Sequence, residues 1–522
     1  MSSEKYRLTF GSTTNRCHVI ANTAKQSLYY TIIKKTFLLI LSMLYISPGM
    51  SQSETYGFTC YNIETSGSMA TGKYTPFWMA SNKYGTVPLE AGNAYLRTGV
   101  FQDNRVGNKL QVTAGLDIIA SAPRYRNIYI QQLYAGVKYK SLDITIGSKE
   151  NYTSLWNREL SSGDIVTSAN ARPIPEINIS VPGFTSVPYT NGILQFKGNF
   201  AVGRSFDADY IKQFINEKQY YTINTLWHHK SLHIRLIDPQ SDFPLMATMG
   251  VRHHVQWGGT STDPEVGKQP HSFKDFLRIV AGKSGGVDAY HSDSLNILGN
   301  HYGSYDLKLG YLTPAFDIYV YKQHYFDDVS GMELYNINDG LYGIQATIHG
   351  FTPLKHIVLE FVNTRNQSGP IHHIIYDHDT YPGYGGGNDD YYNTNGYRTG
   401  VSYFNRSTGS PLLTSPEYNK NGDLGFKNNR IQAFHLGIQG YISQQVSYRI
   451  FATSSEGWGT NDRPFLKKES NFSCATQISY CHPKLENWLF SGEIAADFGS
   501  TLYGDNLGIS ISIRKYGILK KW

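Results

Sequence analysis

The chain has 522 residues, with 17% charged and 14% aromatic side chains, 50 glycines, 40 tyrosines and a formal net charge of +6. This length predicts several domains or one large closed sheet, and the low charge with abundant glycine and tyrosine favours short twisted strands over helical packing. The sequence has no block of lysine and arginine and no nucleic-acid-binding motif, so we expect no nucleic acid partner.

The first recognisable element is the apolar segment Thr36–Ile46, which follows two lysines and precedes small residues that end at Ser51. A charged start, an apolar stretch of about ten residues and small residues are typical of a cleaved secretory signal. A membrane anchor is the alternative, but a helix needs about 20 apolar residues to cross a bilayer. We therefore expect residues 1–51 to form a cleaved leader and signal peptide.

Beyond residue 51 no segment could span a membrane as a helix, which leaves a secreted protein or a β-barrel. The remaining cysteines are Cys60, Cys474 and Cys481, and an odd number argues against a disulfide framework in an oxidising compartment. Cys474 and Cys481 would point to opposite faces of one strand, whereas a hairpin between them would allow pairing.

Alternation with a period of two runs through the mature chain. Apolar residues alternate with polar or very small residues over 110–120, 133–139 and 142–146, and Lys140-Ser141 forms a tight turn between the last two segments. This pattern predicts amphipathic strands joined as a hairpin. It returns in four later segments, at residues 318–323, 341–346, 435–440 and 507–514.

A membrane barrel and a soluble sandwich or propeller show the same alternation, because each has one apolar and one polar face. Strand-like runs near ten residues, a polar second face and short turns mixed with long loops favour the barrel, and no blade-length repeat is present. We expect residues 52–522 to form a single all-β domain, a large antiparallel transmembrane β-barrel of about 16–18 strands with extended loops. Its last strand, near an aromatic C-terminus, resembles the signal read by the outer-membrane insertion machinery.

Two segments predict short helices. Residues 207–218 place Tyr210, Ile211 and Phe214 on one stripe, and residues 272–280 begin with Ser272 as an N-cap. We expect both helices in periplasmic or plug-like insertions rather than in the barrel wall.

The loop at residues 381–397 is the most unusual segment of the chain. It combines flat aromatic rings with amides and carboxylates, the mixture typical of carbohydrate-binding surfaces. A solvated turn-rich loop is the plain alternative, and a calcium site at its two aspartates lacks the spacing of a known calcium loop. The candidate sugar-binding residues are Tyr381, Tyr384, Asn388, Asp389, Asp390, Tyr391, Tyr392, Tyr397 and, from a separate Trp-Gly-Gly segment, Trp257.

The sequence gives weak support to metal binding or catalysis. Neighbouring histidines such as His253-His254 point to opposite faces of a strand, so they form a poor metal pair. No nucleophile elbow is present, and neighbours such as Asp327-Asp328 would diverge instead of facing each other as the carboxyls of a glycosidase do. We expect no cofactor and no enzymatic activity.

Several stretches together resemble the Wzi-type capsule assembly family. They are TPFWMASNKYGTVP (75–88), IYIQQLYAGVKY (128–139), IGSKE (146–150), NGILQFKGNFAVG (191–203), QWGG (256–259), LGNHYGSYD (298–306) and YVYKQHYFDDVSGMELYNINDGLYGI (319–344). The resemblance implies a Gram-negative outer-membrane barrel with small periplasmic helices, in contact with outer-membrane lipid, that acts as a lectin and anchors capsular polysaccharide without a reaction of its own. It maps no sugar-binding residue onto this chain.

Two other functions stay open from the sequence. A porin-like channel for sugars or small solutes would have an open lumen with a charged constriction, and a surface enzyme acting on polysaccharide would have a cleft with two facing carboxyls. A polysaccharide-binding barrel would instead have a lumen blocked by side chains or inserts.

Overall fold

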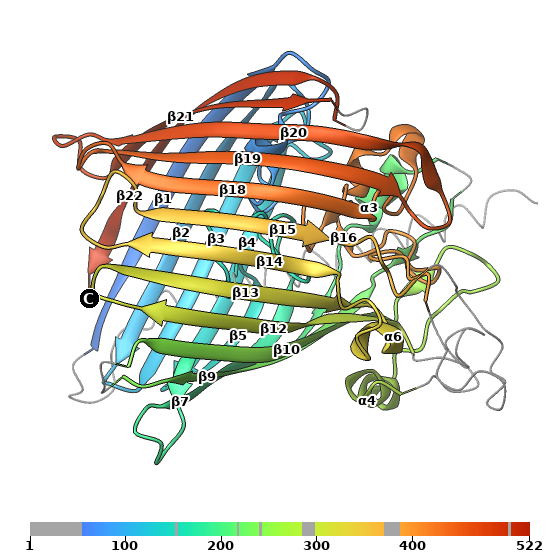
Figure 1. Ribbon diagram of the computed structural model, residues 1–522, viewed down its shortest axis with the longest axis horizontal. Coiled ribbons are helices and arrows are strands. Elements are labelled where there is room, and N and C mark those ends of the chain that lie inside the picture. Colours follow the sequence, from blue (N-terminus) through green and yellow to red (C-terminus); the bar gives the residue numbers. More distant parts are fainter. Residues whose placement is uncertain are drawn as a thin grey trace, which may run out of the picture.

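The computed structural model describes residues 55–521, apart from 152–154, 217–218, 240–242, 284–297, 370–386 and 500–502. Eighteen strands of this part form one closed antiparallel sheet, in which each strand pairs with its neighbour along the wall and β22 pairs with β1 (Figure 1). The wall consists of β1 (Thr55–Ala70), β2 (Asn93–Val106), β3 (Leu110–Ala122), β4 (Ile128–Tyr139), β5 (Leu142–Ser148), β6 (Glu176–Ser186), β7 (Leu194–Arg204), β9 (Leu226–Ile237), β10 (Leu245–Trp257), β12 (Asn300–Leu312), β13 (Phe316–Phe326), β14 (Gly340–Ile348), β15 (His356–Asn363), β18 (Ile431–Tyr441), β19 (Val446–Gly459), β20 (Pro464–Cys481), β21 (Trp488–Phe498) and β22 (Asn506–Lys521).

The alternation along β22 shows which face of the wall meets lipid. Leu507, Ile509 and Ile511 are 53%, 52% and 63% exposed on the outside, whereas Ser510 and Ser512 line the interior. A closed sheet leaves no unpaired edge, and an apolar outer belt suits a bilayer. The prediction of a transmembrane barrel of 16–18 strands is therefore confirmed, and the sandwich and propeller alternatives are wrong.

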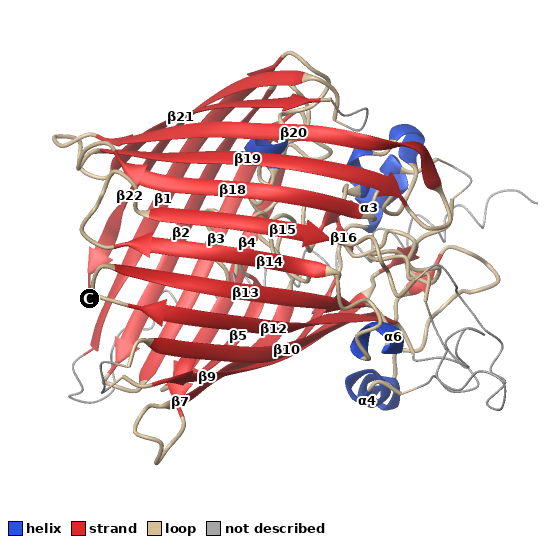
Figure 2. Ribbon diagram, viewed as in Figure 1, coloured by secondary structure: helices blue, strands red, loops and turns tan. Residues whose placement is uncertain are grey.

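The two ends of the barrel differ. One end, here called the turn end, has connections that range from the two residues Lys140-Ser141 to the seven residues 349–355, and it carries both ends of the described chain (Figure 2). The opposite, long-loop end carries the connections 149–175, 258–299 and 364–430. Outer-membrane barrels have short periplasmic turns and long extracellular loops, so the long-loop end faces outward.

Both predicted helices are present, as α3 (Ala208–Phe214) and α4 (Phe273–Ala281). Ser272 caps α4 in a reciprocal pair with Asp275, which satisfies two backbone N–H groups at the helix start. Both helices lie in long connections outside the barrel wall, as expected, and at the long-loop end (Figure 1). With this end facing outward, the periplasmic alternative does not fit their position. The sequence did not predict the short elements α2 (Phe77–Ala80), α6 (Val329–Met332), β8 (Thr222–Ile223), β11 (Thr260–Ser261), β16 (Ser402–Tyr403), β17 (Arg406–Ser407), η1 (Pro416–Tyr418) and η2 (Lys420–Gly422).

Helix α4 packs against the outside of the wall. On β10, Gln256 points inward, because its amide donates to the carbonyl oxygen of Gly400 in the lumen at 2.9 Å. Its neighbours Val255 and Trp257 therefore point outward, and there they form a buried apolar cluster with Ile279 of α4. No helix in the described ranges is long and apolar enough to cross a membrane.

Segments inserted from the long-loop end fill much of the lumen. We call residues 73–92, 155–175 and 387–430 the plug. Its apolar side chains form one buried cluster with inward-facing side chains of the wall, including Phe77, Trp78, Leu160, Ile165, Val166, Tyr392, Leu413, Tyr302, Tyr321, Leu341 and Val362. Among the described residues the plug thus packs against the wall and occupies much of the lumen.

The two cysteines in the last third of the chain do not form a disulfide. Cys474 and Cys481 lie on the single strand β20, without a hairpin between them. Both are free thiols, as is Cys60.

Candidate functional site

A buried ionic cluster fixes the plug to the wall. Arg252 on β10 donates to Asp164 of the plug at 2.6 Å and to Asp306 on β12 at 2.7 Å. His233 and Ser304 also contact Asp306, at 2.8 and 2.9 Å. The three charged side chains are at most 3% exposed. A cluster so deeply enclosed holds the plug in one position, because separating the partners would leave uncompensated buried charges.

Two further contacts anchor the plug elsewhere on the wall. Glu360 of β15 accepts hydrogen bonds from the Ser161 hydroxyl at 2.7 Å and the Ser162 backbone N–H at 2.6 Å. Nearby on the wall, the indole N–H of Trp78 donates to the Thr453 hydroxyl of β19 at 3.1 Å, and its ring stacks on Phe451 at 5.1 Å. Glu360 and Thr453 both pair in register with His435 of β18, so these two contacts lie two strands apart and fix the plug to the same side of the barrel.

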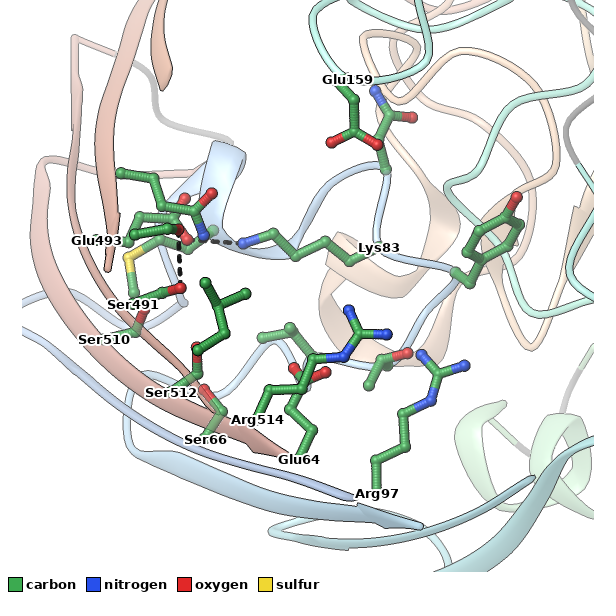
Figure 3. A pocket seen from close by; sticks show the side chains of 18 of the residues that line it. Glu64, Ser66, Lys83, Arg97, Glu159, Ser491, Glu493, Ser510, Ser512 and Arg514 are labelled. Atoms are coloured by element: carbon green, nitrogen blue, oxygen red, sulfur yellow. Dashed lines mark hydrogen bonds and ion pairs between the residues drawn. The ribbon is translucent and has the colours of Figure 1, made fainter. Parts of the chain in front are cut away.

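Between plug and wall lies a chamber of about 790 Å³ (Figure 3). Its wall side is formed by inward-facing residues of β18–β22, β1, β2 and β4, and its other side by plug residues 78–87 and 158–161. The lining reaches Ser447 and Leu489, next to the turn-end starts of β19 and β21. The chamber is thus bounded by the plug toward the long-loop end and extends toward the turn end.

Most charges that line the chamber are paired. Lys83 bridges to Glu493 at 2.8 Å. Arg97 contacts Glu150 at 2.9 Å, and Arg449 contacts Glu159 at 2.6 Å. Between these pairs the lining carries serine hydroxyls, amides and tyrosine or phenylalanine rings. This composition suits a polar ligand with many hydroxyl groups better than a simple ion or an apolar molecule.

The chamber shows no arrangement that would support metal chemistry. In the part of the chain that the structure describes, no group of three histidine, cysteine or acidic side chains is placed to hold a metal ion. Burial raises the pKa of the Tyr84 hydroxyl, which lines the chamber, to about 12. It therefore remains a neutral hydroxyl at physiological pH.

Two of the predicted sugar-binding tyrosines lie inside the protein. Tyr391 and Tyr392 are 0% exposed. The Tyr391 hydroxyl donates to Asp339 at 3.0 Å, and the Tyr392 hydroxyl donates to the carbonyl oxygen of Ile165. The expectation of an exposed loop is wrong at these two positions. Both rings are completely buried by packing at the plug, so neither presents a face to a ligand.

The other predicted loop residues lie near them at the long-loop end. Asp389 accepts from Ser368 at 2.7 Å, and Asp390 accepts from Asn393 at 3.0 Å. Burial raises the pKa of the Asp390 carboxyl. Asn388 is half-buried, Tyr397 is buried in the plug, and Tyr381 and Tyr384 lie outside the described residues. The described side chains of this set pack and hydrogen-bond within the long-loop end, and sugar contact by any of the predicted residues stays a prediction.

Trp257 belongs to a different environment. It is 4% exposed and lies between the outer face of β10 and α4, with its ring centroid 5.7 Å from that of Phe276. Trp257 packs under α4 on the outside of the barrel, which agrees with interface packing as its alternative role, and sugar contact by it stays a prediction.

The sequence did not predict the chamber, although it contained one signal. The alternating polar positions of residues 507–514 line it. The remaining lining comes from distant strands and from the plug, whose position depends on contacts such as that between Arg252 and Asp164. No local pattern in the sequence indicates these long-range contacts.

The comparisons place this architecture among known proteins. The profile of the family described as Capsule assembly protein Wzi matches residues 43–404, more than half of the chain. Wzi of Escherichia coli, described as an outer membrane protein involved in group 1 capsule assembly and a carbohydrate-binding β-barrel, has a TM-score of 0.53 and 11% identity, over 87% of this chain and 83% of that chain. Pseudomonas aeruginosa OccK5 has a TM-score of 0.44 and 9% identity, over 90% and 99%. At these identities the structures show a shared fold alone. No curated protein matches the sequence.

Proposed function

Because this chain belongs to the Wzi family of capsule assembly proteins, we propose that it is a non-enzymatic outer-membrane protein that binds capsular polysaccharide and anchors it at the cell surface. The observation that carries the proposal is a membrane barrel whose lumen is filled by a plug attached through Arg252, Glu360 and Trp78. A filled lumen suits a protein that holds a polymer better than one that passes solutes.

Three considerations support the proposal. The Wzi barrel of Escherichia coli, which shares this fold, binds carbohydrate. The long-loop end offers extended segments on the side that faces outward. The described charged side chains of the chamber are largely engaged in ion pairs with one another. The partners of this function are capsular polysaccharide, outer-membrane lipid and, during biogenesis, the outer-membrane insertion machinery.

Binding by the purified protein tests the proposal. The full chain in lipid nanodiscs is titrated with the capsular polysaccharide of its host, with dextran as the control polymer. The proposal expects saturable binding of the capsular polymer and none of dextran. Equal binding of both polymers, or of neither, would overturn it.

Conductance separates this function from the channel alternative. In planar bilayers the wild-type protein is expected to show no stable ion conductance, because the plug occupies the lumen. Steady single-channel currents from the wild type would favour the porin-like function instead.

A further inference from the structure

The wall of the chamber carries a continuous row of serines. Ser66 on β1 pairs in register with Ser512 on β22, which pairs with Ser491 on β21. Ser491 in turn pairs with Ser479 on β20, and Ser479 with Ser447 on β19. All five line the chamber. Register pairing on five successive strands places their hydroxyls side by side across the wall.

This row has the dimensions and chemistry of a shallow groove. Adjacent strands lie about 4.8 Å apart, so five strands span roughly 20 Å. Serine is small, so the row leaves space in front of the wall, and each hydroxyl can both donate and accept a hydrogen bond. Only one hydrogen bond within the row joins neighbours among the described residues, between Ser479 and Ser491 at 2.8 Å.

The plug closes the groove on its other side. Lys83 reaches from the plug to Glu493 on β21, beside Ser491, as Figure 3 shows. At the other edge, Arg514 and Glu64 lie next to the serines of β22 and β1 (Figure 3). Arg514 uses its Nε to donate to Asn62 at 2.7 Å, and Glu64 accepts from the Tyr95 hydroxyl at 2.5 Å.

A second, independent observation is an unpartnered hydroxyl at the same surface. Ser68 lies two residues beyond Ser66 on the inward face of β1, lines the chamber and is 8% exposed. Its hydroxyl has no hydrogen-bond partner among the described residues. A buried hydroxyl without a partner is costly, so a ligand or water that satisfies it is favoured there.

We propose that the chamber is a binding site for a short glycan segment that lies along the serine row. This inference rests on the proposed function and names the site and ligand class within it. The row supplies hydrogen bonds to sugar hydroxyls, and Tyr95 and Phe101 of the lining supply faces for sugar C–H groups. A simple ion is disfavoured because Lys83, Arg97 and Arg449 already have acidic partners.

The test uses the full chain in detergent and oligosaccharides prepared by partial acid hydrolysis of the host's capsular polysaccharide. The test variant combines Ser479→Ala, Ser491→Ala and Ser512→Ala, which removes three hydroxyls with little change in volume. Ser180→Ala is the matched control, since Ser180 lies on β6 and does not line the chamber. A second variant, Ser491→Trp, fills the groove. Unchanged mobility of the folded barrel on unheated gels confirms folding of each variant.

The proposal expects the triple variant to bind the oligosaccharides about tenfold or more weakly, since three hydrogen bonds are lost. Ser491→Trp should abolish binding, and Ser180→Ala should bind like wild type. Wild-type affinity in both the triple variant and Ser491→Trp would overturn the chamber site. Absence of oligosaccharide binding by wild type would also overturn it, whereas the proposed function fails only if intact capsular polysaccharide is not held.

Discussion

Arg252 of the barrel wall and Asp164 of the plug form a 2.6 Å ion pair in which neither side chain is more than 3% exposed. The same guanidinium contacts Asp306, a carboxylate of the neighbouring strand β12. One arginine thus connects a strand that contacts lipid to a segment that fills the lumen, which makes the plug part of the folded core.

Removal of this connection should destabilise the whole barrel. Arg252→Ala leaves two buried carboxylates without their counter-charge, so the free energy of unfolding should fall by about 3–5 kcal/mol. Urea unfolding in detergent, followed by tryptophan fluorescence, measures the change. The control is Arg126→Ala, whose partner Asp209 is 76% exposed and whose loss should cost less than about 1 kcal/mol. Equal losses in the two variants would contradict the assigned role of Arg252.

The anchor of the plug at β19 should respond to the size of residue 78. Trp78→Ala removes the stacking on Phe451 and the hydrogen bond to Thr453, and should lower stability by about 3–5 kcal/mol. Trp78→Phe keeps an aromatic ring and should lose distinctly less. The same unfolding assay compares them, and identical losses would show that the stacked ring contributes nothing.

The stability of the protein should depend on pH through Asp207, at the start of α3. Burial raises the pKa of its carboxyl to about 6, and the carboxyl accepts from the Phe404 backbone N–H at 3.1 Å. The folded state therefore binds a proton more tightly than the unfolded state, and this group's contribution to stability falls as pH rises from about 4 to 6.

Asp207→Asn removes that titration while it keeps an oxygen acceptor. Relative to wild type, the variant should gain about 2–3 kcal/mol of stability between pH 4 and pH 7. Unfolding midpoints of both proteins at the two pH values measure the gain. A constant difference across this range would mean that Asp207 titrates as an ordinary carboxyl.

The outward side of α4 should lie in the membrane interface. Phe273 and Leu277 are 75% and 52% exposed, on a helix whose other face packs against the outside of β10. An amphipathic helix with exposed apolar residues at a bilayer surface is expected to contact lipid. A tryptophan introduced by Phe273→Trp should therefore be quenched by brominated lipids more strongly than one introduced by Lys274→Trp. Stronger quenching at position 274 would contradict this orientation.

The wall could be predicted because strand alternation is local. Leu507, Ser510 and Ile511 each follow from a period of two and need no knowledge of distant residues. The Ser272 cap of α4 is similarly local. The end of the barrel that carries the helices could not be predicted from a local pattern, because it depends on the direction of every preceding strand.

The candidate site was harder to predict for a physical reason. Glycine, asparagine and tyrosine are frequent both in exposed turns and in inserted segments without regular structure, so composition gave no indication that Tyr391 and Tyr392 are buried. The serine row could not be predicted from the sequence for another reason. Ser66 and Ser512 are far apart in the chain and become neighbours only when β22 closes the barrel against β1.

The most direct test of capsule anchoring is the amount of polysaccharide that stays on cells. The gene is deleted in its native host, restored with the wild-type gene, and cell-attached, shed and total capsular polysaccharide are measured in all three strains. We expect that deletion lowers attached polymer and raises shed polymer at constant total, and that restoration reverses both changes. Unchanged attachment in the deletion strain would contradict it.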